Sequence, residues 1–312
     1  MESSPIGVLI MAYGSALGIK EEAIHNYLRH ILQYYRKTDP DDVDVQDLRA
    51  RYQAIGGSPL YEITERIAQG VQDALDLSFP RQFKVYTAMK HSPPFIKDTV
   101  IEMRRNGIDK TIAVALAPFR SRLSTEGYYH LVVKAGKVMT PSMQCFPLED
   151  WNLHPLFLML WKNRINDALR LIGSEPAVIF TNHSLPQHIQ QWNDAYPEQF
   201  KMTAKVLSQE CNLSHWTIAY QSAGGGSQTW LGPHLAEVIQ GWKNKGFSEF
   251  LLAPIGFLMD HLEILYDLDV EAQSMAKTLN VKVDRTTMPN DDPLFLAMLV
   301  DLIREKCSTK SM

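Results

Sequence analysis

The chain has 312 residues, 45% of them hydrophobic, and a formal net charge of -4. That length fits two α/β units of roughly 150 residues each, with enough apolar residues to bury a substantial core. No Lys/Arg block is long enough to form a nucleic-acid or anionic-membrane surface, so we expect neither as a partner.

Cysteine usage and hydropathy indicate a soluble protein of the reducing cytoplasm. Cys145, Cys211 and Cys307 are isolated, without a CxxC or a zinc-ligand spacing, which predicts free thiols and no disulfide framework. The start of the chain lacks the basic segment and long apolar run of a signal peptide. The longest apolar run, 250–259, contains Pro254 and is too short to span a bilayer.

Short apolar runs alternate with longer amphipathic stretches along the chain. The expected strands are Gly7–Tyr13, Phe83–Met89, Thr111–Pro118, Gln144–Pro147, Ala177–Asn182, Trp216–Gln221, Glu249–Ile255 and Val281–Asp284. The expected helices include Glu21–Tyr35, Pro59–Leu75, Pro94–Arg105, Pro155–Leu171, Pro197–Glu210 and Pro233–Lys245. This alternation is typical of βαβ units with a parallel sheet, so the predicted fold class is α/β.

The order of strands in the first half repeats in the second half. Three strands of the first half, with the residues that follow them, match three strands of the second half. This repeat predicts two similar open sheets whose strand carboxyl ends face a shared cleft. The rim of that cleft would carry Tyr13, Lys90, His183, Ser222 and Glu263. The predicted domains are residues 1–148 and 149–290, followed by a C-terminal helix and polar tail at 291–312.

The most informative segment is 256–271, which follows an apolar strand. If it is helical, its acidic residues recur at steps of three and four and share one face. These residues are Asp260, Glu263, Asp267 and Glu271. A solvated acidic face is the ordinary explanation of such a ridge. The segment directly follows a buried strand, which is where α/β proteins place their active sites. This position favours a functional role for the acidic residues.

His183 ends an apolar strand in the segment Phe180-Thr-Asn-His-Ser-Leu-Pro186. Taken alone, it fits a hydrogen-bonded core histidine or a helix cap as well as a functional group. Opposite a carboxylate, a neutral imidazole can bind Fe(II), Zn(II) or Co(II), or transfer protons near neutral pH. The chain has no HExxH, and its glycine-rich loops at 56–57 and 224–226 match no nucleotide-binding motif.

Polar and aromatic residues near the cleft suit a large carboxylated ligand. Arg51 and Tyr52 precede a helix start that Ser58 caps, which suits carboxylate binding, although surface solubility explains one arginine equally well. The cleft side is also rich in large apolar residues, namely Met11, Tyr13, Tyr52, Met89, Phe119, Tyr128, Trp230 and Met259. Most would belong to the core by default, but a large flat ligand would need such walls.

Taken together, these motifs resemble the ferrochelatase family, the metal-inserting enzymes of haem synthesis. The most specific pair is His183-Ser-Leu-Pro186 with Asp260-His-Leu-Glu263. The other matching segments, in family order, are Met11-Ala-Tyr-Gly14, Arg51-Tyr52, Ile55-Gly-Gly-Ser-Pro-Leu60, Lys90-His91, Leu116-Ala-Pro118, Asp194-Ala-Tyr-Pro197, Gln221-Ser222, Trp230-Leu-Gly-Pro233 and Pro254-Ile-Gly-Phe257.

The resemblance implies two Rossmann-like domains with four-stranded parallel sheets and a porphyrin cleft between them. It implies that His183 and Glu263 flank the metal and help to remove the pyrrole protons. Asp267 and Glu271 would form the outer path of the metal. Tyr13 matches a tyrosine of the Gram-positive branch, which uses coproporphyrin III and coordinates the iron from the opposite face. The implied porphyrin contacts are Arg51, Tyr52, Ser58 and Tyr128.

The implied activity is insertion of Fe(II) into coproporphyrin III by a monomer. We expect no tightly bound cofactor, and no iron–sulfur cluster because a cysteine-bearing C-terminal extension is missing. Two alternatives stay open. One is a porphyrin- or haem-binding paralogue without activity. The other is a chelatase for protoporphyrin IX, cobalt or nickel; related cobalt and nickel chelatases usually have a second histidine where this chain has Glu263.

The chain departs from the family at four points. Relatives of this branch carry arginines where this chain has Ile31-Leu-Gln-Tyr34. Phe119 stands in place of a histidine, and Gln221-Ser-Ala-Gly-Gly225 in place of a Gln-Ser-Glu-Gly-Asn run. A residue is also missing between Gly57 and Ser58. These departures predict a changed porphyrin-binding wall and leave a divergent paralogue open.

Overall fold

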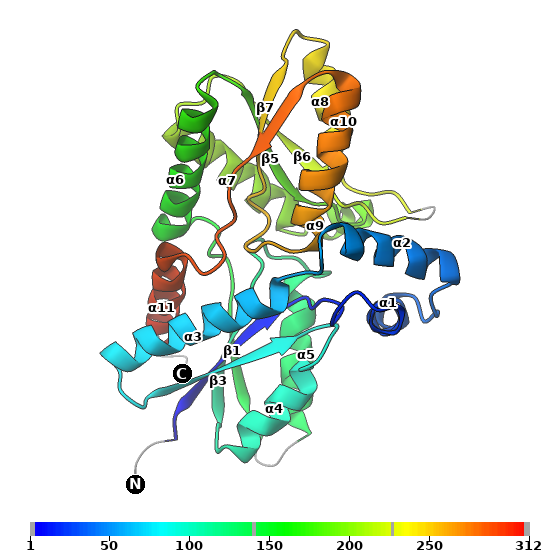
Figure 1. The fold of residues 1–312 in the computed structure, drawn as a ribbon. Coiled ribbons are helices and arrows are strands. Elements are labelled where there is room, and N and C mark those ends of the chain that lie inside the picture. The colour runs from blue at the N-terminus through cyan, green and yellow to red at the C-terminus, as the bar shows by residue number, and fades with distance from the viewer. Residues whose placement is uncertain (1–3, 139–141, 226–227, 309–312) are drawn as a thin grey trace.

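The computed structural model describes residues 4–138, 142–225 and 228–308, which form two α/β halves stacked one above the other (Figure 1). The N-terminal sheet has the order β2-β1-β3-β4 and the C-terminal sheet the order β6-β5-β7-β8, with all strand pairs parallel. The strands are β1 (Ile6–Ala12), β2 (Phe83–Met89), β3 (Lys110–Ala115), β4 (Gln144–Leu148), β5 (Ala177–His183), β6 (Trp216–Gln221), β7 (Glu249–Ala253) and β8 (Lys282–Arg285). The prediction of two four-stranded parallel sheets is confirmed.

Helices enclose the sheets. In the N-terminal half they are α1 (Glu21–Tyr35), α2 (Asp42–Ala54), α3 (Leu60–Ser78), α4 (Ile96–Arg105) and α5 (Thr125–Lys137). The later ones are α6 (Pro155–Ile172), the 3-10 helix η1 (Gln187–Trp192), α7 (Tyr196–Glu210), α8 (Leu235–Lys243), α9 (Leu262–Leu265), the π-helix η2 (Asp267–Glu271), α10 (Ala272–Leu279) and α11 (Pro293–Ser308). The sequence did not single out α2, which buries only Val45 and Tyr52 and so has a weak apolar pattern.

The central strand β1 is apolar on both faces because helices cover both. Val8 and Ile10 belong to the hydrophobic cluster that includes residues of α3, whereas Leu9 and Met11 pack with residues of α4 and α5. All four side chains are 0% exposed. A parallel sheet covered on both faces therefore explains why this strand shows a continuous apolar run in place of an alternating one.

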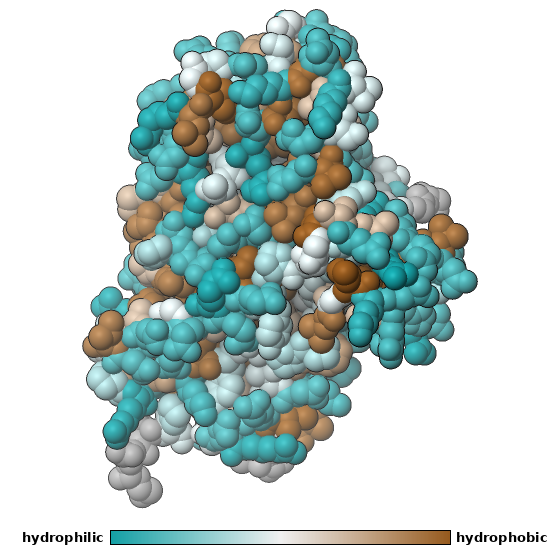
Figure 2. All heavy atoms as spheres, viewed as in Figure 1, coloured by the Kyte–Doolittle hydropathy of each residue, from teal (hydrophilic) through white to brown (hydrophobic). Residues whose placement is uncertain are grey.

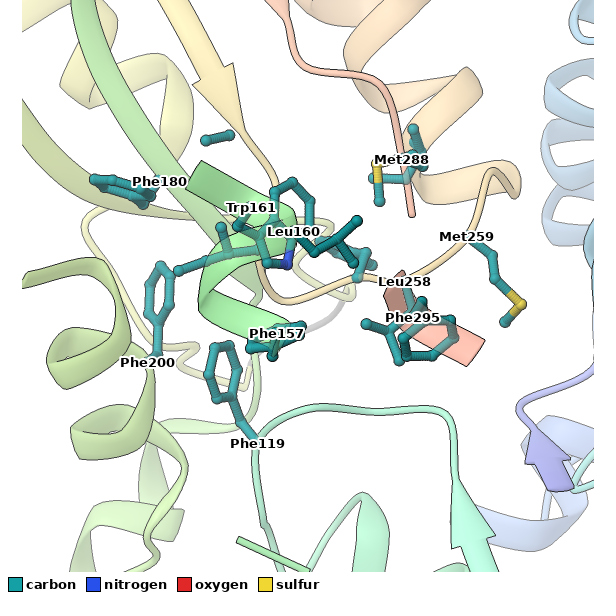
Figure 3. Packing of buried hydrophobic residues seen from close by; sticks show 14 of the residues in the cluster. Phe119, Phe157, Leu160, Trp161, Phe180, Phe200, Leu258, Met259, Met288 and Phe295 are labelled. Carbon is teal, nitrogen blue, oxygen red and sulfur yellow. The ribbon is translucent and has the colours of Figure 1, made fainter. Parts of the chain in front are cut away.

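One hydrophobic cluster runs through both halves of the molecule (Figure 3). Phe119, which follows β3, is 1% exposed and lies with its ring centroid 5.7 Å from that of Phe200 in α7. Helix α11 packs against both α3 and α6. Phe119 is thus a core residue, as expected from the sequence for most of the large apolar residues near the cleft. Because the core is shared, the domain boundaries after residues 148 and 290 stay predictions.

The segment 256–261 is not helical, which corrects the prediction of an acidic helix opening at residue 256. Gly256 donates its N–H to Thr181, and an added Cβ there would lie 1.9 Å from the Asn182 side-chain oxygen. The Asp260 carboxylate accepts hydrogen bonds from Asn290 at 2.7 Å and Arg285 at 3.4 Å. Asp260 is therefore held away from the ridge, which retains the other three acids.

Most of the surface shown in Figure 2 is hydrophilic, with apolar residues scattered over it. Exposed apolar side chains include Leu17, Ile19 and Val43, which lie around α1 and α2. In the part of the chain that the structure describes, no helix has the length and apolar character needed to cross a membrane.

Candidate active site

The site lies where strand ends of the two sheets approach each other. Tyr13 follows β1, His183 ends β5, and Glu263 lies in α9, beyond β7. Burial raises the pKa of the Tyr13 and Tyr128 hydroxyls well above the ordinary value, and the nearby charge of Glu263 raises both further. The tyrosines of the N-terminal half and the glutamate of the C-terminal half therefore lie within electrostatic reach of each other.

His183 is fixed in one tautomer. Its Nδ1 lies 2.5 Å from the carbonyl oxygen of Ser184, which can only accept, so Nδ1 carries a proton. Burial lowers the pKa of His183, and the charge of Glu263 opposes that shift. A neutral imidazole in this tautomer has its lone pair on Nε2. That atom is the one able to accept a proton or bind a metal.

Glu263 lies beside a second histidine, His261. The His261 Nε2 and Glu263 Oε2 atoms are 3.1 Å apart, and His261 Nδ1 lies 2.8 Å from the Met259 carbonyl oxygen. Since Nδ1 donates to that carbonyl, the contact between Nε2 and the carboxylate needs a second proton, on either partner. The sequence motif contained His261, but nothing in the sequence indicated that its ring would turn toward Glu263.

The backbone around Glu263 is tied to the C-terminal sheet. The Gln221 side-chain amide donates to the Glu263 carbonyl oxygen at 2.8 Å, and its oxygen accepts from the Thr181 hydroxyl at 2.7 Å. Tyr196 places its hydroxyl 2.8 Å from the carbonyl oxygen of His183. These contacts position the two candidate catalytic residues from behind.

Two further acids extend outward from Glu263 along η2. Asp267 accepts a hydrogen bond from the Ser222 hydroxyl, yet burial raises its pKa to about 7, with Glu263 and Glu271 contributing in the same direction. Arg51 opposes this shift. Asp267 can therefore take up and release a proton near neutral pH, which an ordinary aspartate cannot do.

Arg51 lies beside this acidic segment. Its Nε donates to Asp47 at 3.0 Å, and its guanidinium lies 5.2 Å from the centroid of the Tyr266 ring. Burial lowers the pKa of Arg51, but the carboxylates of Asp47, Glu271 and Asp267 together hold it above the ordinary value. In this structure the guanidinium is thus shared among acids, and its contact with a porphyrin stays a prediction.

Tyr52 and Ser58 belong to the N-terminal wall. The Tyr52 hydroxyl lies 3.0 Å from the Ser15 hydroxyl oxygen and accepts the Ala16 N–H, and burial raises its pKa to about 12. Ser58 accepts the N–H of Leu60 at the start of α3 and lines a cavity of about 210 Å³. That cavity is lined only by residues of the N-terminal half and holds neither His183 nor Glu263.

The described residues contain no group of three or more His, Cys, Asp or Glu side chains placed to hold a metal ion. His183 and Glu263 are coupled electrostatically, and together they offer one imidazole nitrogen and carboxylate oxygens. Those donors suit a borderline divalent metal. A metal between them would need further ligands from another molecule, such as the nitrogen atoms of a macrocycle.

Chelatases of known structure share this two-domain fold. The chain is similar to the structure named SirB from Bacillus subtilis with Fe3+, with a TM-score of 0.62 and 12% identity over 97% of this chain and 96% of that one. It is also similar to CbiX, named as the terminal enzyme for biosynthesis of siroheme in denitrifying bacteria, with a TM-score of 0.54 and 14% identity over 96% and 98%.

Sequence comparison is more specific, and it shows that the chain belongs to the ferrochelatase family, whose model matches residues 5–307. The chain is 36% identical to coproporphyrin III ferrochelatase 2 of Bacillus cereus over 98% of this chain and 96% of that one. It is 36% identical to the coproporphyrin III ferrochelatase of Listeria monocytogenes, over 97% of this chain and 98% of the relative. It is 34% identical to the ferrochelatase of Herpetosiphon aurantiacus, over 96% of this chain and 99% of the relative.

Proposed function

We propose that this protein inserts Fe(II) into coproporphyrin III as a step of haem synthesis. The observation that carries the proposal is the free Nε2 of His183 beside the proton-sharing pair of Glu263 and His261, opposite a wall of tyrosines. Family membership and the names of the relatives support the reaction and its substrate.

Inserting a divalent metal into a free porphyrin releases two pyrrole protons. His183 Nε2 accepts the two protons one after the other, on the face of the macrocycle that it shares with Glu263, and passes each on before it takes the next. Glu263 and His261 relay protons to Asp267, whose pKa of about 7 lets it both take them and release them near neutral pH. His183 and Glu263 also hold the iron briefly, before the pyrrole nitrogens replace them as ligands.

The same acids guide the metal. Glu263, Asp267 and Glu271 form a line of carboxylates from the candidate catalytic pair outward, and such a line concentrates divalent cations. Because two protons leave along this line for each Fe(II) that enters, the net charge of the site does not change. Glu271 is the first group to meet the metal, and Glu263 delivers it.

The porphyrin would lie against the N-terminal wall. Tyr13 approaches the metal from the face opposite His183, and the remaining contacts are Arg51, Tyr52, Ser58 and Tyr128. The preference for coproporphyrin III over protoporphyrin IX rests on Tyr13 and on the names of the relatives. The enzyme would act as a cytoplasmic monomer without a resident cofactor or an iron–sulfur cluster.

An anaerobic assay with purified protein, Fe(II) and coproporphyrin III tests this function. We expect the four-banded visible spectrum of the free porphyrin to change to the two-banded spectrum of its iron complex at a rate proportional to protein concentration. Protoporphyrin IX and Co(II) run in parallel test the choice of substrates. Saturable porphyrin binding without formation of any metal complex would contradict the proposal and favour a non-catalytic porphyrin-binding protein.

A further inference from the structure

Lys90 is a buried ammonium group without an acidic partner. It follows β2 and is 3% exposed, and its Nζ donates one hydrogen bond, to the Tyr35 hydroxyl at 3.0 Å. The rings of Tyr34, Tyr35 and Tyr128 surround Nζ, with centroids 5.1, 5.3 and 5.0 Å away. No carboxylate among the described residues lies within ion-pair distance, so only one of the three N–H donors has a hydrogen-bond acceptor.

This arrangement opposes folding. Burial of a cation without a counter-charge is unfavourable, and burial lowers the pKa of Lys90 to about 8. Cation–π contacts with the three tyrosine rings offset part of the cost. An apolar side chain of similar length would fill the same space without the cost of burying a charge. A charged group kept in such a place is a candidate for ligand recognition.

The cage of Lys90, defined by Tyr34, Tyr35 and Tyr128, lies on the side of the N-terminal half that faces the C-terminal half. Tyr128 is within electrostatic reach of Glu263 in the C-terminal half. Tyr35 is 46% exposed, and its hydroxyl is hydrogen-bonded to that of Tyr13. The next residue, Arg36, reaches the carbonyl oxygen of Gly225 in the opposite half at 3.4 Å, so the end of α1 lies at the mouth between the halves.

Close packing behind Lys90 fixes the ammonium at this point. An added Cβ on Gly127 in α5 would lie 2.8 Å from Nζ, so only glycine there lets the ammonium approach α5 this closely. The backbone N–H of Lys90 donates to the Ala12 carbonyl oxygen at 2.9 Å, which fixes its Cα beside the end of β1. The cation is thus held from behind, and its most exposed neighbour is Tyr35.

We propose that Lys90 and the Tyr35 hydroxyl bind a carboxylate group of the tetrapyrrole substrate. The proposal rests on the proposed function and names one point at which that substrate is recognised. A carboxylate only accepts hydrogen bonds, and here it meets an ammonium with free N–H donors beside a phenolic O–H. Binding neutralises the buried cation, so the substrate supplies the charge that the folded chain lacks.

Binding of two porphyrins without iron tests this subsite. Coproporphyrin III and its uncharged tetramethyl ester share one macrocycle, and both are titrated by protein fluorescence quenching in the same mild non-ionic detergent. We expect Lys90→Met to weaken binding of the acid roughly 10- to 100-fold and to change binding of the ester less than about twofold. The melting temperature should not fall, because the variant removes an unpaired buried charge.

Two further variants complete the experiment. Lys84→Met is the matched control, because Lys84 lies on the same strand with its Nζ 5.3 Å from the Tyr86 ring, and it should change neither affinity. Tyr35→Phe keeps the ring and removes only the hydroxyl of a half-exposed side chain. It should weaken binding of the acid roughly 3- to 10-fold, and it tests the subsite independently of the folding of the Lys90 variant.

Unchanged binding of coproporphyrin III to Lys90→Met would overturn the proposal. Equal weakening of the acid and the ester would also overturn it, because Lys90 would then shape the wall without recognising charge. Metal insertion by the wild-type protein is measured in parallel. A wild-type protein that binds the acid but inserts no iron contradicts the proposed function alone, whereas one that binds no porphyrin contradicts both proposals.

Discussion

Hydrogen-bond partners give the two histidines of the site different proton states. In His183, Nδ1 donates to the Ser184 carbonyl and leaves Nε2 free to accept. In His261, Nδ1 donates to the Met259 carbonyl and Nε2 faces Glu263, so a proton must lie between the two side chains. His183 Nε2 is therefore able to accept a proton, whereas the His261–Glu263 pair already holds one and can take another only after passing its own on.

Asp267 should make the stability of the protein depend on pH. Folding raises its pKa from 3.8 to about 7, so between these pH values the folded chain binds more protons than the unfolded chain. Its contribution to stability is full below about pH 4 and is lost as the pH rises through about 7. We expect Asp267→Asn to be roughly 2–4 kcal/mol more stable than the wild type at pH 8, with the advantage disappearing toward pH 4.

Urea unfolding across this pH range measures that difference. Asp76→Asn, at an exposed position on α3, is the control and should follow the wild type at every pH. An Asp267→Asn variant that is no more stable than the wild type at pH 8 would mean that this carboxylate is not held at a raised pKa.

Among single residues, the sequence predicted the candidate catalytic side chains that come after strands. It did not predict contacts that depend on the direction in which a side chain points. His183 could be found because it ends a buried strand, and Glu263 because it lies in the acidic segment that follows one. The contact of His261 with Glu263 depends on the Met259 carbonyl, which no pattern encodes. The cage of Lys90 needs Tyr35 from the end of a helix 55 residues earlier in the chain.

Among the elements, the acidic segment shows how tertiary contacts override spacing. Its acids recur at helical steps, yet Asn290 and Arg285 hold Asp260 in a non-helical segment, and the helix begins only at Leu262. The chain then widens into the π-helix η2, in which the N–H of Glu271 bonds to the carbonyl of Tyr266. Contacts that pull Asp260 out of the helix come from residues beyond the segment, so its sequence could not predict them.

The turn that carries this segment requires glycine at position 256. An added Cβ would lie 1.9 Å from Asn182 Oδ1 and 2.8 Å from Asn182 Cα, beside His183. We expect Gly256→Ala to lower the free energy of unfolding by roughly 2–4 kcal/mol and to reduce metal insertion, since relief of the overlap displaces the histidine strand.

Denaturant unfolding and the insertion assay test this expectation together. Gly241→Ala is the matched control, because it lies in α8 with nothing within 4 Å of an added Cβ. It should leave activity unchanged and add up to about 1 kcal/mol of stability through its helix propensity. Equal behaviour of the two alanine variants would show that the turn does not need glycine.

At the scale of the whole molecule, one core fixes the two halves relative to each other. Phe119 follows the N-terminal sheet, and its ring lies 6.1 Å from that of Tyr196 and 5.7 Å from that of Phe200 in the C-terminal half. Arg66 in α3 of the N-terminal half adds an ion pair with Asp291, just before α11, at 2.9 Å. The departure from the family at Phe119 therefore concerns the joint between the halves and not the porphyrin wall.

Phe119→His tests that interpretation. A histidine in this 1% exposed site would bury a polar ring among aromatic neighbours, so we expect a loss of roughly 2–4 kcal/mol in the free energy of unfolding and no gain in activity. Phe79→His, at a half-buried ring in the N-terminal half, should cost less. A clear increase in the rate of metal insertion by Phe119→His would contradict the core assignment.

In the proposed mechanism, His183 accepts a pyrrole proton during metal insertion. Single-turnover insertion of Fe(II) into bound coproporphyrin III tests it most directly, with His183→Ala compared with the wild type and with His188→Ala, a partly buried histidine beyond the same strand. We predict that His183→Ala lowers the insertion rate at least about 100-fold, keeps porphyrin affinity within a few-fold, and leaves His188→Ala at the wild-type rate. Insertion by His183→Ala at the wild-type rate would show that His183 is not the proton acceptor.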